Sequence, residues 1–167
     1  MLVNRFEELP DTARVWVYGV DREIDGNSQA VLLHEVEAYL RDWTAHGVPL
    51  SAGRDLSENR FLTIAVDQEQ AGASGCSIDG LFRTLKSLEQ KIGAGIITSG
   101  LIFFRGGDGT IRSVTRDDFT ELGTSGEVDG ETEVFDLSVV TLGEWRARFT
   151  SRAADSWHAS LLPARAG

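Results

Sequence analysis

The chain has 167 residues, with 26 acidic and 16 basic side chains, and a formal net charge of -10 at pH 7. A chain this acidic is a poor candidate for binding a nucleic-acid backbone or an anionic membrane surface, because binding to either requires a basic face. Only two basic residues are lysines, Lys86 and Lys91, and neither stands in the Gly-Lys-Ser/Thr sequence of a nucleotide-binding P-loop. We therefore expect no P-loop ATPase, no nucleic-acid partner and no membrane partner.

The composition, with 41% hydrophobic and 25% charged residues, is typical of a globular protein of one domain. The first residues lack a basic stretch followed by an apolar run, so we expect no signal peptide. The single cysteine, Cys76, cannot form an intramolecular disulfide, which favours a reducing, cytoplasmic location. The predicted domain has a core over residues 12–115, a C-terminal extension over 116–162 and a frayed tail over 163–167.

Alternating and helical apolar patterns predict the elements of the first half in chain order. Residues 14–21 alternate as a strand, and a helix then follows with an apolar stripe that includes Leu32, Val36 and Leu40. Two strands come next, at residues 50–56 and 60–67, the second of them strongly apolar. A second helix carries a stripe from Ile78 to Ile92.

The second half begins with strands at residues 100–105 and 110–115, joined by the hairpin signal Gly106 to Gly109. The order strand, helix, strand, strand, helix, strand predicts an α+β, ferredoxin-like βαββαβ fold, with two helices on one face of an antiparallel sheet. A C-terminal β/α extension follows. It has a short helix capped by Thr115 and Asp118, a strand at 133–137 and a helix over 141–152.

This topology brings three distant residues to one end of the sheet: His46 after the first helix, Asp67 after the third strand and Cys76 at the start of the second helix. A thiol in the first helical turn has a lowered pKa, and its thiolate is a nucleophile. His46 would accept the thiol proton and Asp67 would orient the imidazole. These three residues are the predicted catalytic group.

Further residues would complete a binding site at the same end. The amides of Ser77 and Ile78 would hold an oxyanion, and Asp79 follows them in the first turn. The tail sequence Ser156 to His158 would fold back and add Trp157 and His158.

Structural interpretations of the same residues stand beside this hypothesis. Cys76 fits a small buried residue, and His46 a helix C-cap. Ser77 fits an N-cap, while Asp67 and Asp79 fit loop and helix-dipole partners. Trp157 would then anchor the tail and leave His158 exposed. No short-range ligand pair is present, so we predict neither a metal nor a cofactor.

Charge is unevenly distributed along the chain. Residues 106–137 contain nine acidic side chains and two arginines, whereas residues 144–167 contain four arginines and two acidic side chains. The arginine-rich segment 144–167 is expected to pack on the acidic segment 106–137 through weak surface ion pairs.

Several segments together resemble a family of small bacterial proteins that often carry the label "ABC transporter ATPase". The resemblance rests on residues 43–50 (WTAHGVPL), 60–67, 73–79 (ASGCSID) and 156–158 (SWH). It implies that His46, Asp67, Cys76, Asp79, Trp157 and His158 belong to the family's motif set. The resemblance implies no known activity, and the missing P-loop speaks against the label.

Two functional hypotheses follow. In the first, Cys76 is a thiolate nucleophile or redox thiol that acts on a small molecule in a Cys/His/Asp pocket. In the alternative, the protein is a non-catalytic module that binds a small ligand or another protein. Exposed sheet edges also leave room for a homodimer.

If Cys76 is a thiolate, it alkylates at pH 6–7 faster than a model thiol with a pKa of ~8.5. Iodoacetamide labelling followed by mass spectrometry measures this rate. Slow labelling that does not change in a His46→Ala variant would remove the catalytic hypothesis.

Overall fold

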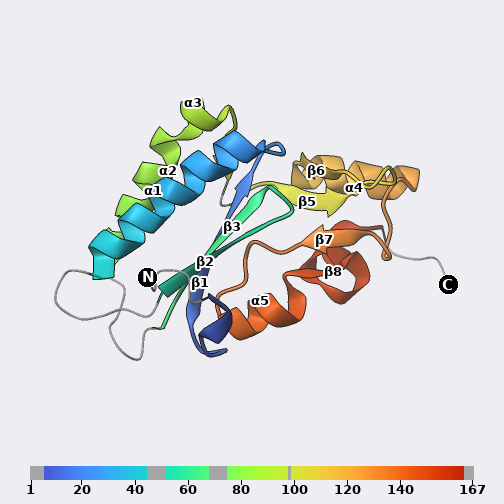
Figure 1. The fold of residues 1–167 in the computed structure, drawn as a ribbon. Coiled ribbons are helices and arrows are strands. Elements are labelled where there is room, and N and C mark those ends of the chain that lie inside the picture. The colour runs from blue at the N-terminus through green and yellow to red at the C-terminus, as the bar shows by residue number, and fades with distance from the viewer. Residues whose placement is uncertain (1–5, 45–51, 68–74, 98, 164–167) are drawn as a thin grey trace.

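Two antiparallel four-stranded sheets and the helices around them form the architecture of the computed structural model, an α+β arrangement (Figure 1). The structure describes residues 6–44, 52–67, 75–97 and 99–163, and of residues 43–44 and 75–78 it describes the backbone alone. A short 3-10 helix, η1 (Phe6–Glu8), precedes the first strand.

The first sheet lies under the helices of the N-terminal half. Its strands are ordered β2-β3-β1-β4, and each neighbouring pair is antiparallel. The elements in chain order are β1 (Arg14–Val20), α1 (Gly26–Thr44), β2 (Ala52–Ser57), β3 (Phe61–Val66), α2 (Gly75–Ser87), α3 (Glu89–Ile92) and β4 (Ile96–Ile97). One face of the sheet packs against the predicted helix stripes, which contribute Leu32, Val36, Leu81 and Leu85 to the same buried cluster as Leu62 and Ile64.

The last strand of the first sheet differs from the prediction. Residues 100–105 were expected to complete this sheet, but the two-residue β4 pairs with Gly19 and Val20 instead. The strand β5 (Ile102–Arg105) belongs to the second sheet. Because Gly100 adopts a positive φ of 90°, the chain turns inside an apolar run whose sequence does not mark the break.

The second sheet has the strand order β6-β5-β7-β8, again antiparallel. Its remaining elements are β6 (Ile111–Val114), α4 (Arg116–Ser125), β7 (Glu133–Phe135), α5 (Leu142–Arg148), β8 (Thr150–Arg152), η2 (Ala153–Asp155) and η3 (Trp157–Leu161). The predicted β5–β6 hairpin is confirmed, and Thr115 caps α4 by accepting a hydrogen bond from the Asp118 amide at 3.1 Å. The final helix is shorter than predicted because residues 150–152 pair with β7.

Strand β3 is buried on both faces, which explains why every residue from Phe61 to Val66 is buried. Its second face contributes Phe61 and Ala65 to a cluster shared with the second sheet and α5. The Phe61 ring lies 5.2 Å from Phe103, 4.9 Å from Phe135 and 5.3 Å from Phe149, measured between ring centroids. These aromatic contacts hold the two sheets together.

Ion pairs connect the acidic segment 106–137 with arginines of the segment 144–167. Glu131 pairs with Arg152 at 2.9 Å, and Asp136 pairs with Arg148 at 3.1 Å. The expectation that the arginine-rich segment 144–167 packs on the acidic segment 106–137 is therefore confirmed.

Replacing Phe61 with alanine is expected to destabilise the protein by about 3–5 kcal/mol, because a cavity opens between the sheets. Chemical denaturation measures the change in the free energy of unfolding. Val31→Ala is the control, since Val31 is 37% exposed on α1 and its loss should cost within about 0.5 kcal/mol. A Phe61→Ala variant as stable as Val31→Ala would contradict this account of the interface.

Candidate functional site

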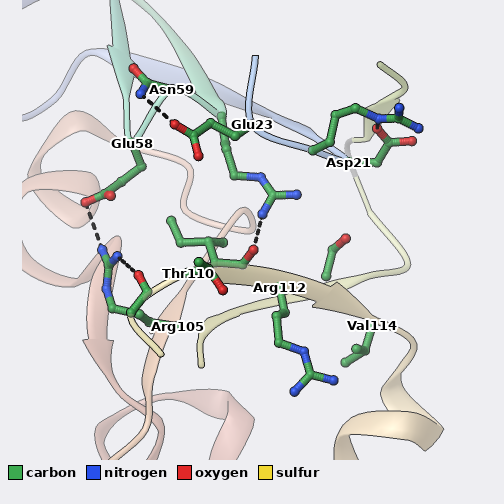
Figure 2. Close-up of a pocket in the computed structure, with 13 residues that line it drawn as sticks. Asp21, Glu23, Glu58, Asn59, Arg105, Thr110, Arg112 and Val114 are labelled. Carbon is green, nitrogen blue, oxygen red and sulfur yellow. Dashed lines mark hydrogen bonds and ion pairs between the residues drawn. The ribbon is translucent and has the colours of Figure 1, made fainter. Parts of the chain in front are cut away.

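A cleft of about 580 Å³ lies where the first sheet meets the β5–β6 hairpin. Its walls come from the end of β1 with the following residues 21–23, from the β2–β3 turn, and from the hairpin. Figure 2 draws the turn residues Glu58 and Asn59 on one side of the cleft and Arg105, Thr110 and Arg112 on the other. The cleft is thus formed by the two sheets together.

Arg60 is the most buried charged side chain in this cleft, with only 5% of its surface exposed. Its Nε donates a hydrogen bond to the Val20 carbonyl at 3.2 Å, and its Nη1 donates to the Ile111 carbonyl. The guanidinium lies 6.0 Å from the Phe103 ring centroid. Arg60 therefore connects β1 of the first sheet to β6 of the second and contributes a cation to the cleft wall.

The Arg60 cation has no carboxylate partner within the part of the chain that the structure describes. Among the described residues, none brings a carboxylate within 4.0 Å of the Arg60 nitrogens. Burial lowers the pKa of Arg60, and the more distant Asp21 and Glu23 oppose this shift. Burying a charge without a counterion is costly, because two neutral carbonyls replace only part of its hydration.

The other cleft arginines are paired. Arg105 contacts Glu133 at 2.7 Å and Glu58 at 3.0 Å, and hydrogen bonds to these two carboxylates raise its pKa. Arg112 pairs with Glu127 at 3.2 Å, and Arg22 with Asp21 at 3.4 Å. Counting only partners among residues 6–44, 52–67, 75–97 and 99–163, Arg60 is thus the cleft arginine that lacks an anion.

A strained turn positions Arg60. Glu58 and Asn59 have φ angles of 57° and 55°, the left-handed region that a two-residue type I′ hairpin turn requires. Asparagine tolerates this region, but glutamate rarely adopts it. Figure 2 shows two contacts that hold the turn, the Glu58–Arg105 ion pair and an Asn59 side-chain hydrogen bond to Glu23 at 3.2 Å. In addition, the Ile24 amide donates a hydrogen bond to the Asn59 carbonyl at 3.1 Å.

Sequence reasoning did not select Arg60. It read residues 60–67 as an apolar strand and gave the first residue no role. The available signal was a single arginine directly before six apolar or small residues, a pattern in which the cation is carried to the edge of the core.

The predicted catalytic residues are only partly within the described structure. His46 lies outside the described residues. Helix α2 begins at Gly75, so Cys76 is in its first turn as the hypothesis requires, but its side chain is not described. Asp67 directly follows β3 and is half-buried with an interaction partner. The Cys/His/Asp group stays a prediction.

Of the predicted binding residues, Ser77 and Ile78 are described by their backbone in α2 alone, and Asp79 is exposed on this helix. Asp79 lines a second pocket with Arg14, whose strand position pairs with Val66. The end of β3 and the start of α2 therefore lie at the same end of the first sheet.

Trp157 and His158 pack on the second sheet's side of the molecule. His158 is 1% exposed and lies 6.3 Å from Phe119 of α4 between ring centroids, whereas Trp157 is 37% exposed. The interpretation that leaves His158 exposed is wrong, because Trp157 covers it by stacking at 4.0 Å and donates to Asp136 at 3.2 Å.

Comparison with family models, curated proteins and solved structures found no match for the chain. Within the described residues, no helix has the length and apolar character needed to span a bilayer. The same residues contain no group of three or more His, Cys, Asp or Glu side chains arranged to hold a metal ion.

His158 is expected to make stability depend on pH. Burial lowers its pKa from 6.5 to about 4, a shift that Asp136 opposes and Arg116 reinforces. The unfolded chain takes up the proton first, so stability is complete above pH 6.5 and falls as the pH drops toward 4. The loss is on the order of 3 kcal/mol.

Urea unfolding between pH 7.5 and 4.5 measures this effect in the wild type and a His158→Asn variant. The stability difference between them should shrink as the pH falls. His34→Gln is the control, because His34 is exposed on α1. A wild-type advantage over His158→Asn that stays constant with pH would contradict the neutral buried imidazole.

Proposed function

We propose that the protein binds a small molecule bearing a single carboxylate, with this group on the Arg60 guanidinium in the cleft between the sheets. The observation that carries the proposal is the buried Arg60 cation, which lines a cleft of about 580 Å³ and has no carboxylate partner among the described residues. An anionic ligand would supply the missing counterion.

The charges around Arg60 favour a carboxylate over a phosphate group. Asp21, Glu23 and Glu58 line the same cleft. They would repel a phosphate dianion more than a group with one negative charge. A carboxylate also matches the planar guanidinium, which can donate two parallel hydrogen bonds to it.

The bonds that Arg60 already makes support this binding mode. The Val20 and Ile111 carbonyls accept from Nε and Nη1, which fixes the guanidinium plane before a ligand arrives. A preorganised side chain loses little conformational entropy on binding. The proposal corresponds to the ligand-binding alternative drawn from the sequence, at a different site.

Two further parts of the sequence interpretation remain proposals. We infer that the first sheet with α1 and α2 is a ferredoxin-like unit, supported by its element order and by the strand order β2-β3-β1-β4. We also propose a cytoplasmic location, on the basis of the single cysteine.

Calorimetric titration tests the carboxylate proposal. The probes are monocarboxylates from acetate to benzoate, each paired with its uncharged amide, and inorganic phosphate. The carboxylates should bind more tightly than both the amides and phosphate, and should raise the unfolding temperature.

An Arg60→Lys variant keeps the charge but loses the planar fork, so its carboxylate affinity should fall roughly tenfold or more. Arg112→Gln, in the same cleft but already paired with Glu127, is the control and should bind as the wild type does. Equal binding of acid and amide, or an equal loss in both variants, would refute the assignment to Arg60.

A further inference from the structure

The Arg60 cleft also contains a carboxylate that lacks a cation. Glu23 accepts a hydrogen bond from the Asn59 side-chain amide at 3.2 Å, and no Arg, Lys or His nitrogen of the described residues lies within 4.0 Å of its carboxylate. Figure 2 draws Glu23 with one carboxylate oxygen on Asn59 and the other turned away from it. Asp21 and Glu58, the other two carboxylates that line the cleft, each pair with an arginine.

One hydrogen-bonded junction positions both Glu23 and Arg60. The Ile24 amide donates to the Asn59 carbonyl at 3.1 Å, and the Val20 amide donates to the Arg60 carbonyl at 2.8 Å. Asn59, whose side chain holds Glu23, directly precedes Arg60 in the chain. The cation and the carboxylate that lack partners are therefore carried by two adjoining segments with fixed backbones.

The two charges are near each other but not in contact. Glu23 acts to raise the pKa of Arg60 against the larger effect of burial, yet its oxygens lie more than 4.0 Å from the Arg60 nitrogens. Asp21 acts on Arg60 in the same way, but its carboxylate already accepts from the Gly95 amide at 3.0 Å and from Arg22 at 3.4 Å. The gap between Arg60 and Glu23 is thus open to a molecule that carries both kinds of charge.

The charge balance of the cleft favours a ligand without net charge. Arg22 and Arg112 each pair with one carboxylate, so neither leaves a charge in excess. Arg105 contacts two carboxylates and leaves one negative charge in excess, whereas Arg60 and Glu23 add one charge of each sign. A ligand with only a carboxylate would add to this negative excess, but a zwitterion would not.

We propose that the ligand of this cleft is a small free amino acid, with its carboxylate on Arg60 and its ammonium group on Glu23. The inference rests on the carboxylate-binding function proposed above and adds a second charged group to the ligand. An ammonium group has three N–H donors, and the Glu23 oxygen that is turned away from Asn59 can accept a charge-assisted hydrogen bond from one of them.

Calorimetric titration of the full chain with three probes of one carbon skeleton tests this inference. Propionate carries the carboxylate alone, whereas L-alanine and β-alanine add an ammonium group at its second or third carbon. At least one of the two amino acids should bind roughly threefold to tenfold more tightly than propionate at pH 7. The amide of that amino acid, which keeps the ammonium group and lacks the carboxylate, should bind roughly tenfold or more weakly than the acid.

A Glu23→Gln variant removes the charge and keeps an oxygen that can accept from Asn59. It should lower the affinity for the preferred amino acid to that for propionate. It should not weaken propionate binding, because it takes a negative charge out of the cleft. Glu121→Gln is the matched control, since Glu121 is exposed on α4 and is not part of the cleft lining, and it should keep the preference for the amino acid.

The outcomes separate this inference from the function on which it rests. If propionate binds and loses affinity in Arg60→Lys, but neither amino acid binds more tightly than propionate, the amino-acid inference fails and the carboxylate proposal stands. A preference for the amino acid that survives in Glu23→Gln, or that Glu121→Gln loses equally, would also overturn the inference. If none of the three probes binds at millimolar concentration, both proposals fail.

Discussion

The two-sided burial of β3 is the constraint on which the remaining structure depends. Leu62, Ile64 and Val66 pack under α1 and α2. Phe61 and Ala65 pack against the second sheet. Because the strand is apolar throughout, both layers are needed to remove it from water. Arg60 directly precedes this strand, so its side chain is carried into the junction of the two sheets, where the Val20 and Ile111 carbonyls hold it.

Two arginines lie near opposite ends of β1: Arg14 on the strand itself and Arg60 beside Val20. The chain has 26 acidic side chains, and most of the described arginines pair with them. Among the described residues, no carboxylate pairs with half-buried Arg14 or with buried Arg60, and each of them lines a pocket. Since a buried cation without a counterion lowers stability, the anionic ligand proposed for Arg60 would recover part of that free energy.

The sequence predicted the parts of the fold that local patterns determine. Alternation in β1, the helix stripes, the glycine hairpin and the Thr115 cap each depend on neighbouring residues. The sequence could not predict that β4, and not residues 100–105, completes the first sheet. This outcome depends on a turn at Gly100 and on pairing with a distant strand. The burial of Arg60 could not be predicted for the same reason, because it results from packing against the second sheet and not from a local sequence pattern. Of the three residues in the Cys76 hypothesis, Asp67 is described, whereas His46 and the Cys76 side chain lie outside the described part of the chain.

The most direct test of the central claim is to observe the Arg60 guanidinium itself. In a side-chain ¹⁵N NMR titration with benzoate, the Arg60 Nε–H signal should shift with saturation, while the signals of the paired Arg105 and Arg112 stay in place. Benzamide should leave all three unchanged. A titration in which benzoate shifts the Arg112 signal, or in which the Arg60 signal does not move in the folded protein, would contradict the account.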